Sequence, residues 1–377
     1  MRFAILTGIV AVSGLSQGML LPLLAMLLDE NGVSSSVNGA HAAALYIGVL
    51  AISPFLERPL RRYGYRLLIL LGGFIVICSL ILFPLFPSLF FWIVLRFAIG
   101  IGDHMLHFAT QTWITDFSPP AERGRRLSLY GWAFGLGFTI GPLLAALASA
   151  EEALPFYLAA LLSFVGWITV FWLPNEKPKP LERSSSTAGR FIGAWRQAWP
   201  ALLLPFAYGF LEAAVHSIFP LYALRERMSA EQIAFILPCF SLGGIIFQLP
   251  LGALSDRFGR RRVITGALLA GACCFLIALT VGASTVGLAA CLFTAGMFTG
   301  SLFSLGIAYM TDLLSKALLP AGNLLCGMLY SLGSMTGPPL AGSVVDLSAR
   351  AFFLAVSVVL LVPAICLVSR REQETAA

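Results

Sequence analysis

The chain has 377 residues, of which 58% are hydrophobic and 11% are charged, and its formal net charge is +6. A soluble domain of this length cannot keep so many apolar side chains from water, which excludes a soluble enzyme or binding protein. The basic residues stand in short segments between apolar runs, a pattern that argues against nucleic-acid binding and indicates the lipid bilayer as a partner.

Twelve long apolar runs follow one another along the chain, and a helix needs about 20 such residues to cross a bilayer core. They cover roughly residues 3–28, 38–56, 67–87, 89–113, 127–149, 154–173, 199–223, 231–251, 262–280, 286–311, 320–346 and 350–369. Glycine and proline inside them are compatible with membrane helices, because neighbouring helices can satisfy the freed backbone groups. We therefore predict an all-α membrane protein with twelve transmembrane helices.

The distribution of basic residues predicts the orientation. The first run starts directly after Arg2 and is too long for a signal-peptide core, so we expect a retained helix. Arg96 lies within a span, and Arg225, Arg227 and Arg350 stand in the loops of one side, while the other 20 of the 24 Lys and Arg lie at the termini and in the loops of the opposite side. Basic loops stay in the cytoplasm, which places both termini there in a multi-pass protein of the cell inner (plasma) membrane.

The second half of the chain repeats the first. Its matching residues stand 196 positions apart: Thr115, Asp116, Gly131, Gly137, Gly141 and Pro142 recur as Thr311, Asp312, Gly327, Gly333, Gly337 and Pro338. Gly14 matches Gly209 at an offset of 195, which sets Gln17 in register with Glu212. Two similar halves in one membrane protein indicate a transport path between them.

This repeat predicts an N-terminal six-helix bundle at 1–173, a cytoplasmic linker at 174–198 and a C-terminal six-helix bundle at 199–377. The linker is rich in proline, serine and charged residues, so it is expected to be solvated and flexible. Its last residues, 190–199, place apolar side chains near one helical face, which predicts a short helix lying in the membrane interface.

The loop at 252–262 reads GALSDRFGRRR. This segment resembles the GxxxDRxGRR signature of the major facilitator superfamily, at the place where the second half of that family carries it. Together with the twelve runs, the repeat and the linker, the resemblance covers essentially the whole chain. It implies two pseudo-symmetric six-helix bundles and transport by alternating access.

The resemblance also implies a cytoplasmic clasp that helps to gate transport. In it, Asp256, Arg257, Gly259 and Arg260 join two helices, and Asp312 on a neighbouring span is the expected partner of the arginines. The alternative interpretation is that these arginines only set the topology.

The first-half copy of this signature is degenerate. Arg61 stands where the family has its Asp, so the family's acid cannot be carried over to this half. Asp116, at the end of the fourth span, is expected to pair with Arg61 or Arg62 instead.

Arg96 begins a segment similar to the RxxxGxG pattern of the same family, whose arginine is associated with proton coupling. A charge inside a span costs roughly 2.5–3.5 kcal/mol on insertion scales, so we expect Arg96 to face the interior with a partner. The alternatives are a static ion pair and a side chain that snorkels to the interface.

Small residues and a proline recur at helix-packing spacing in the fifth and eleventh spans: Gly137, Gly141, Pro142, Gly333, Gly337 and Pro338. The fifth-span copy is similar to the antiporter signature GxxxGPxxGG of drug:proton exporters, although Ala145 and Ala146 replace its last two glycines. The second copy leaves open that the pattern is a property of the repeat rather than a mark of export.

Two acids lie near the middle of predicted spans, one in each half. Asp103 is followed four residues later by His107, and Glu212 by His216, so each pair shares a helical face. A carboxyl group in this setting can take a proton in one conformation and release it in the other. The alternative for each histidine is a hydrogen-bonded packing residue.

These residues give the candidate sites. Proton coupling is assigned to Asp103, Arg96, His107 and Glu212. Substrate binding is assigned to Gln17, Glu212, His216, His104, Trp132 and Tyr330. No catalytic residue, metal site or cofactor is predicted, since neither a CxxC pair nor a Walker motif is present.

The favoured function is secondary transport driven by the proton gradient, with export of small organic molecules. Alternatives are uptake by proton symport or uniport, and export of a metal ion or metal chelate. A membrane sensor or enzyme is the interpretation from another class, and the sequence holds no soluble effector domain or catalytic cluster for it. One chain carries both halves, so a monomer is expected to suffice.

Overall fold

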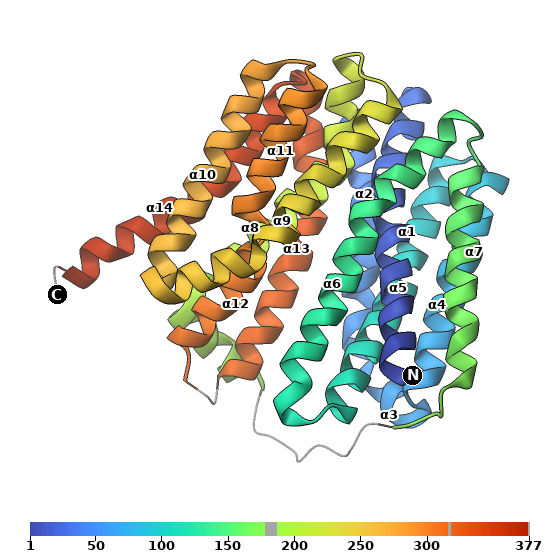
Figure 1. Ribbon diagram of the computed structural model, residues 1–377, viewed down its shortest axis with the longest axis horizontal. Coiled ribbons are helices and arrows are strands. Elements are labelled where there is room, and N and C mark those ends of the chain that lie inside the picture. The colour runs from blue at the N-terminus through green and yellow to red at the C-terminus, as the bar shows by residue number, and fades with distance from the viewer. Residues whose placement is uncertain (178–186, 316–317, 376–377) are drawn as a thin grey trace. The chain divides into compact units, whose positions relative to one another are not determined.

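The computed structural model describes residues 1–177, 187–315 and 318–375. Their secondary structure is helical, with no strand among them, which confirms the predicted all-α class. They fall into two compact units (Figure 1): unit 1 is Met1–Leu28 with His41–Glu182, and unit 2 is Asp29–Ala40 with Arg183–Ala377. The segment that joins the first two helices therefore groups with unit 2 rather than with its sequence neighbours.

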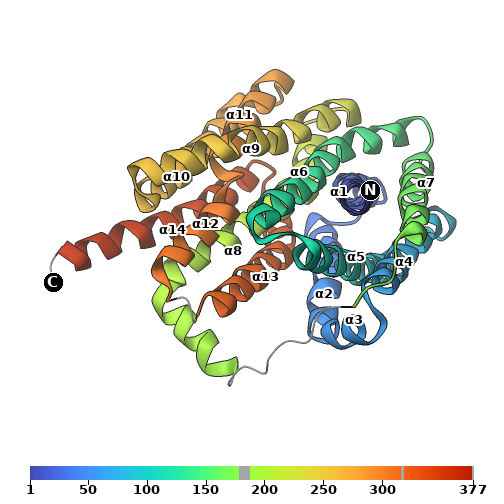
Figure 2. The same cartoon turned by 60° about the horizontal axis from the view of Figure 1, so that its bottom comes forward.

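The first half of the chain is built of long helices joined by short turns. Its elements are α1 (Arg2–Glu30), α2 (Ser35–Ile52), η1 (Ser53–Phe55), α3 (Glu57–Tyr63), α4 (Tyr65–Leu85), α5 (Leu89–Phe117), α6 (Pro120–Ala145), η2 (Ala146–Ser149), α7 (Leu154–Ile168) and η3 (Thr169–Trp172), where η marks a 3₁₀ turn. Within unit 1, α4 packs against α5 and α7. Figure 2 shows α1 nearly end-on, with α5, α6 and α7 around it.

The second half has α8 (Thr187–Arg225), α9 (Ala230–Phe258), α10 (Arg260–Val281), α11 (Thr285–Thr299), α12 (Leu302–Leu313), α13 (Leu319–Leu347) and α14 (Ala351–Thr375). Within unit 2, α8 packs against α13, α12 and α14, and α9 packs against α11. The predicted tenth span is thus two helices, α11 and α12, separated at Gly300 and Ser301. Residues 190–199 are helical, as predicted, and form the first turns of α8.

Eleven helical stretches in the described part of the chain are long and apolar enough to cross a membrane. They correspond to the predicted spans apart from the eleventh, which is the helix α13. That helix is 29 residues long, which is enough to cross a membrane. It is rich in glycine, serine and proline, and these residues lower its mean hydropathy. Such residues are common where one membrane helix packs closely against another.

Backbones touch at the repeated glycines. A Cβ added at Gly137 of α6 would lie 1.9 Å from the carbonyl oxygen of Ala11 in α1, and one at Gly141 would lie 2.4 Å from the backbone of Gly18. In unit 2, the equivalent atoms at Gly333 and Gly337 of α13 would lie 2.1 and 2.6 Å from the carbonyl oxygens of Phe206 and Phe210 in α8. In each unit the backbones of the first and fifth spans therefore come into close contact at these glycines.

We expect Gly137→Val to destabilise unit 1 strongly, because the added side chain would overlap the backbone of α1. Overpacking of this kind costs about 1–3 kcal/mol, and backbone atoms can yield less than side chains. The measurement is the midpoint of thermal unfolding of the purified protein in detergent. Gly131→Val on the same helix is the matched control, since a Cβ there has nothing within 4 Å. Equal midpoints for the two variants would show that the α1–α6 contact is not tight.

Candidate functional site

Asp103 of α5 is the centre of a buried polar network in unit 1. Its side chain is 8% exposed and accepts hydrogen bonds from the Ser13 hydroxyl and, at 2.5 Å, from the Gln17 amide, both on α1. The His107 Nε2 lies 3.4 Å from the same carboxylate, one turn further along α5. In the described residues the imidazole of His107 is the one ionisable group paired with Asp103.

The network continues from Asp103 along α5. The Ser13 oxygen lies 3.0 Å from His107 Nε2, and His107 Nδ1 is hydrogen-bonded to the Tyr130 hydroxyl of α6. That hydroxyl lies 3.3 Å from the Thr110 oxygen. The polar groups therefore form a chain in the order Asp103, Ser13, His107, Tyr130 and Thr110, which runs toward the end of unit 1 where the linker begins.

The donors in this chain follow from its chemistry. Ser13 donates its single proton to Asp103, so His107 Nε2 has to donate to the Ser13 oxygen. In a neutral imidazole Nδ1 is then the acceptor, and the Tyr130 hydroxyl donates to it. Ser13, His107 and Tyr130 thus each direct a proton toward Asp103, whereas the Thr110 hydroxyl donates to the carbonyls of Leu106 and His107.

A small cavity of about 20 Å³ lies beside the carboxylate, between α1, α4, α5 and α7. Asp103, Ser13 and Ser163 supply its polar lining, and apolar side chains such as Ile69 and Trp167 supply the rest. A space of this size has room for about one water molecule, which needs two or more polar partners. The site therefore has room to keep one water next to Asp103.

Two other polar residues of α5, Arg96 and His104, were also predicted to act in transport. Arg96 stands two helical turns before Asp103, and its Nη2 donates to the Leu20 carbonyl at 3.0 Å. Arg96 is 1% exposed, as expected of an interior position, and its Nε and Nη1 have no partner among the described residues. His104 bonds to Ser53 at 2.9 Å, away from the Asp103 network, because adjacent helical positions point about 100° apart.

Unit 2 has a second carboxylate site, around Glu212 of α8. The Tyr208 hydroxyl donates to it at 3.0 Å from one turn earlier, and the Tyr330 hydroxyl of α13 donates at 2.6 Å. The two tyrosine rings are 6.1 Å apart, and the Phe303 ring of α12 lies 5.4 Å from Tyr330. Glu212 thus lies against a group of three aromatic rings, all partly exposed.

His216, predicted to bind substrate, bridges two helices of unit 2. Its Nδ1 donates to the Glu212 carbonyl at 2.9 Å, and its Nε2 lies 3.2 Å from the Ser241 hydroxyl of α9. The side chain is 1% exposed, so its first role is to hold α8 against α9. Trp132 of α6, predicted for the same function, is 50% exposed in unit 1.

The two sites use repeat-equivalent positions on the first helix of each half. Ser13 and Gln17 match Tyr208 and Glu212 at an offset of 195 residues. The carboxylate stands on that first helix in unit 2, whereas in unit 1 it stands on α5 at Asp103 and meets the amide at Gln17. The halves therefore share a scaffold and place the acid differently.

The expected clasp residues of the second half lie together at one end of unit 2. Arg260, at the start of α10, contacts Asp256 at 2.9 Å and Asp312 of α12 at 2.5 Å. Gly259 has φ = +90°, a conformation that side chains rarely adopt, and it separates α9 from α10. Arg257 lies over the Phe258 ring instead, with its guanidinium carbon 5.3 Å from the ring centre.

In the first half, where the copy of the signature is degenerate, an acid from the start of the linker binds the end of unit 1. Glu176 accepts hydrogen bonds from Arg2 at 2.7 and 3.0 Å and from the Trp113 indole at 2.8 Å. Its own carbonyl accepts from the Tyr65 amide at 2.9 Å. The Tyr65 hydroxyl donates to Asp116, and Arg62 lies over the Tyr63 ring. The first residues of the linker are thus bound to unit 1, and residues 178–186 lie outside the described part.

No group of three or more His, Cys, Asp or Glu suited to a metal ion occurs in the described residues. The two acidic sites instead combine one carboxylate each with hydroxyls, amides and aromatic rings. This chemistry suits proton exchange and the binding of organic molecules.

The family model described as Major Facilitator Superfamily matches residues 6–226 and 201–377, which is nearly the whole chain. The chain belongs to the major facilitator superfamily. It is a membrane transporter, not an enzyme, and it has the predicted fold of twelve transmembrane helices in two six-helix bundles.

Relatives in the superfamily are found in Bacillus subtilis (strain 168). The chain is 51% identical over 344 residues to the uncharacterized MFS-type transporter YfkF, across 90% of this chain and 88% of the relative. It is 26% identical over 379 residues to multidrug resistance protein 2, across 96% of this chain and 92% of that protein.

Solved structures of other superfamily members share the fold. A mutant of the nucleoside transporter NupG superposes with a TM-score of 0.82 at 13% identity, across 98% of this chain and 99% of that one. The human organic anion transporter MFSD10 gives a TM-score of 0.68 at 21% identity, across 97% and 98% of the two chains. At these identities the likeness concerns the fold alone.

Several residues of these sites were not predicted from the sequence: Ser13, Tyr130 and Glu176. Ser13 precedes Gln17 by one helical turn, so the spacing already placed it on the predicted polar face. Tyr130 and Glu176 come from other helices or from the linker, and only the packing of the superfamily fold brings them to the site.

We expect Glu176→Gln to loosen the linker-side end of unit 1. The variant loses the charge opposite Arg2 but can keep the hydrogen bond from Trp113, so the expected cost is about 0.5–1 kcal/mol for this partly exposed pair. The measurement is the shift in thermal unfolding midpoint. Glu122→Gln is the control, since that acid pairs within one helix with Arg126 and is more exposed. A larger shift for the control would show that Glu176 does not anchor the linker.

Proposed function

We propose that this superfamily member is a proton-coupled exporter of small organic molecules that works by alternating access. The observation that carries the proposal is Asp103, a buried acid whose one ionisable partner in the described residues is a histidine. An acid held by a permanent cation would stay ionised throughout a transport cycle, whereas this one has partners that tolerate both of its protonation states. It can therefore carry a proton in one conformation and lose it in the other.

The hydrogen-bond chain provides a route for that proton. When Tyr130 passes a proton to His107 Nδ1, Nε2 passes one to Ser13, and Ser13 passes its own to Asp103. Each hydrogen bond then points away from the newly neutral acid, and the proposal requires a proton from water on the linker side to replace the one that Tyr130 has given up. No atom other than hydrogen has to move far, because consecutive members are already within hydrogen-bond distance.

The aromatic group around Glu212 is the proposed binding site for the organic substrate. Aromatic rings bind flat or cationic organic molecules, and a carboxylate adds charge complementarity for an amine. Multidrug resistance protein 2 is the relative whose name favours export over uptake. We place both termini in the cytoplasm and the protein in the plasma membrane as a monomer, in keeping with the basic loops and with both halves lying in one chain.

The proposal is tested with inside-out membrane vesicles that contain the protein. A fluorescent organic cation such as ethidium should accumulate inside them when a proton gradient is imposed, and a protonophore should release it. Accumulation that continues after the protonophore is added would reject proton coupling. Equilibration without accumulation would favour the alternative of a uniporter.

A further inference from the structure

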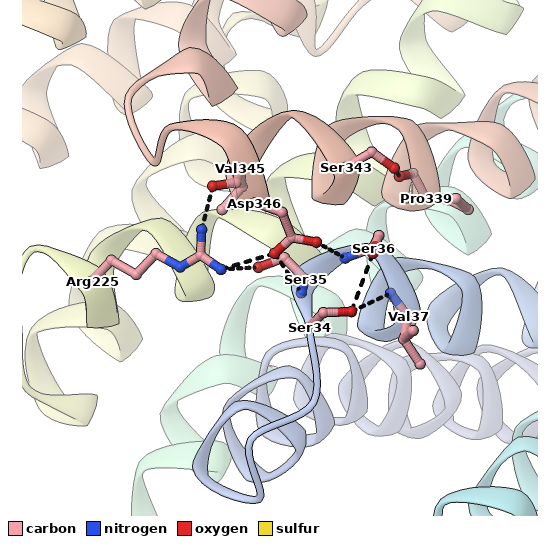
Figure 3. A network of polar contacts seen from close by, with 9 residues as sticks. All are labelled: Ser34, Ser35, Ser36, Val37, Arg225, Pro339, Ser343, Val345 and Asp346. Carbon is pink, nitrogen blue, oxygen red and sulfur yellow. Dashed lines mark hydrogen bonds and ion pairs between the residues drawn. The ribbon is translucent and has the colours of Figure 1, made fainter.

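The first turn of α2 is bound by an acid from another helix (Figure 3). Asp346, at the end of α13, accepts from the Ser35 amide at 2.9 Å with one carboxylate oxygen and from the Ser36 amide at 2.8 Å with the other. The first amides of any helix have no partner within the helix, and a negative charge is favourable there. Asp346 therefore acts as the N-terminal cap of α2.

Arg225, at the end of α8, ties this cap to a third helix. Its Nη2 donates to the Asp346 carboxylate at 2.9 Å and to the Ser35 hydroxyl at 2.8 Å. Its Nη1 donates to the carbonyl of Val345. We use the name α2 cap for the four residues Ser35, Ser36, Arg225 and Asp346. All of them belong to unit 2.

Backbones meet on both sides of the α2 cap. A Cβ at Gly39 would lie 2.1 Å from the carbonyl oxygen of Pro338, and one at Gly342 would lie 2.2 Å from that of Ser35. The start of α2 is thus seated on α13 by close contact as well as by charge. From His41 onward the same helix belongs to unit 1, so α2 passes from one unit to the other.

The repeat shows that the corresponding helix of the second half starts without an acid from another helix. At the offset of 195 residues, α9 is the counterpart of α2, and it caps itself: Ser229 accepts from the Gln232 amide, and the Gln232 side chain accepts from the Ser229 amide. Val37 stands where α9 has Gln232, so α2 lacks that side chain. Ser34 still accepts from the Val37 amide at 3.4 Å, but the amides of Ser35 and Ser36 bond to Asp346.

We propose that the α2 cap is a conformational latch, which holds the start of α2 on α8 and α13 in one state of the transport cycle and releases it in the other. The contacts suit such a device because Arg225 is 33% exposed and Asp346 27% exposed, so water can replace each partner when the helices part. The latch lies at the end of unit 2 opposite the linker, whereas the Arg260 cluster lies at the linker end. It does not depend on which solute or ion is carried.

Hydrogen exchange of the full-length protein in lipid nanodiscs tests the cap. In Asp346→Asn, the amides of residues 35–37 should exchange roughly tenfold faster, with little change in the first turn of α9. Glu152→Gln, an exposed acid in the loop before α7, is the matched control and should leave both turns unchanged. Unchanged exchange at residues 35–37 in Asp346→Asn would overturn the proposal.

A charge swap separates a helix cap from a simple ion pair. Arg225→Asp combined with Asp346→Arg keeps opposite charges, but an arginine cannot accept from the Ser35 and Ser36 amides. Exchange should therefore stay fast in the swap, and a return to wild-type protection would overturn the cap. If Asp346→Asn accelerates exchange throughout both units, exchange is measured in Arg225→Gln instead. In that variant, faster exchange confined to residues 35–37 supports the latch, and unchanged exchange there rejects it.

A distance measurement tests the release itself. Nitroxide labels on Val37→Cys and Leu347→Cys, both at exposed positions, report the separation of α2 and α13 in a background without the native cysteines. Asp346→Asn should increase a longer-distance population about twofold or more, because it removes charge from one state of the equilibrium. A single unchanged distance in both proteins would mean that the cap is static.

Discussion

Asp103→Asn should lose gradient-driven accumulation of substrate by at least about tenfold, equivalent to about 1.4 kcal/mol, while equilibrative exchange continues. The side chain keeps its size and can still bond to Ser13 and Gln17, but it can no longer exchange a proton. The measurement compares uphill accumulation of an organic cation under a proton gradient with its counterflow at uniform pH.

Two variants control for damage to the fold. Asp103→Glu retains a titratable group and should keep part of the coupling, and Glu152→Gln removes an exposed acid far from the network. Transport by Asp103→Asn at the wild-type rate, with unchanged pH dependence, would remove Asp103 from the mechanism.

Glu212→Gln should weaken the binding of a cationic substrate about ten- to a hundredfold, since a hydrogen bond to a charged group contributes about 1.5–3 kcal/mol. A neutral substrate of similar shape should lose far less, because the rings of Tyr208, Tyr330 and Phe303 remain. Binding is measured by tryptophan fluorescence or calorimetry on the purified protein.

Tyr330→Phe is the matched comparison for Glu212→Gln. It removes the hydroxyl that donates to Glu212 at 2.6 Å and keeps the ring. Its effect should be a few-fold, in line with about 0.5–1.5 kcal/mol for one hydrogen bond. If both variants bind cations and neutral molecules as the wild type does, the substrate site lies elsewhere in the protein.

The fold was predictable because few backbone structures can cross a lipid bilayer. Apolar runs long enough to span it have to be helices, and the 196-residue repeat divides them into two bundles. The glycines at Gly137 and Gly333 followed from the same repeat, and the structure places both against backbone of the first helix of their unit. The division of the tenth span at Gly300 was missed, since a short break leaves the hydropathy of a run unchanged.

The candidate sites were predictable only in part. Spacing along one helix placed Asp103 with His107, because residues four apart share a face. It also suggested a role for Arg96 beside Asp103, yet that guanidinium turns to the carbonyl of Leu20 on α1. Which residues meet across helices depends on helix rotation and packing, and this is why Tyr130 was not predicted.

The polar contacts at the two ends of the bundles were also predictable only in part. The GALSDRFGRRR segment predicted where Arg260 meets Asp256 and Asp312, because the segment resembles a known family signature. The binding of Glu176 to Arg2 joins residues 174 positions apart, and no periodicity connects them. Likewise, Asp346 caps a helix that begins more than 300 residues earlier in the chain.

The central claim is that movement of an organic solute is coupled to movement of protons. The most direct test is luminal pH in proteoliposomes that hold the purified protein, read with an enclosed pH dye, while lipophilic cations, neutral antibiotics, nucleosides, sugars and metal chelates are added in turn. We expect at least one organic cation to move protons across the membrane, and empty liposomes to show no such change. A labelled compound that equilibrates through the protein with no change in luminal pH would contradict it.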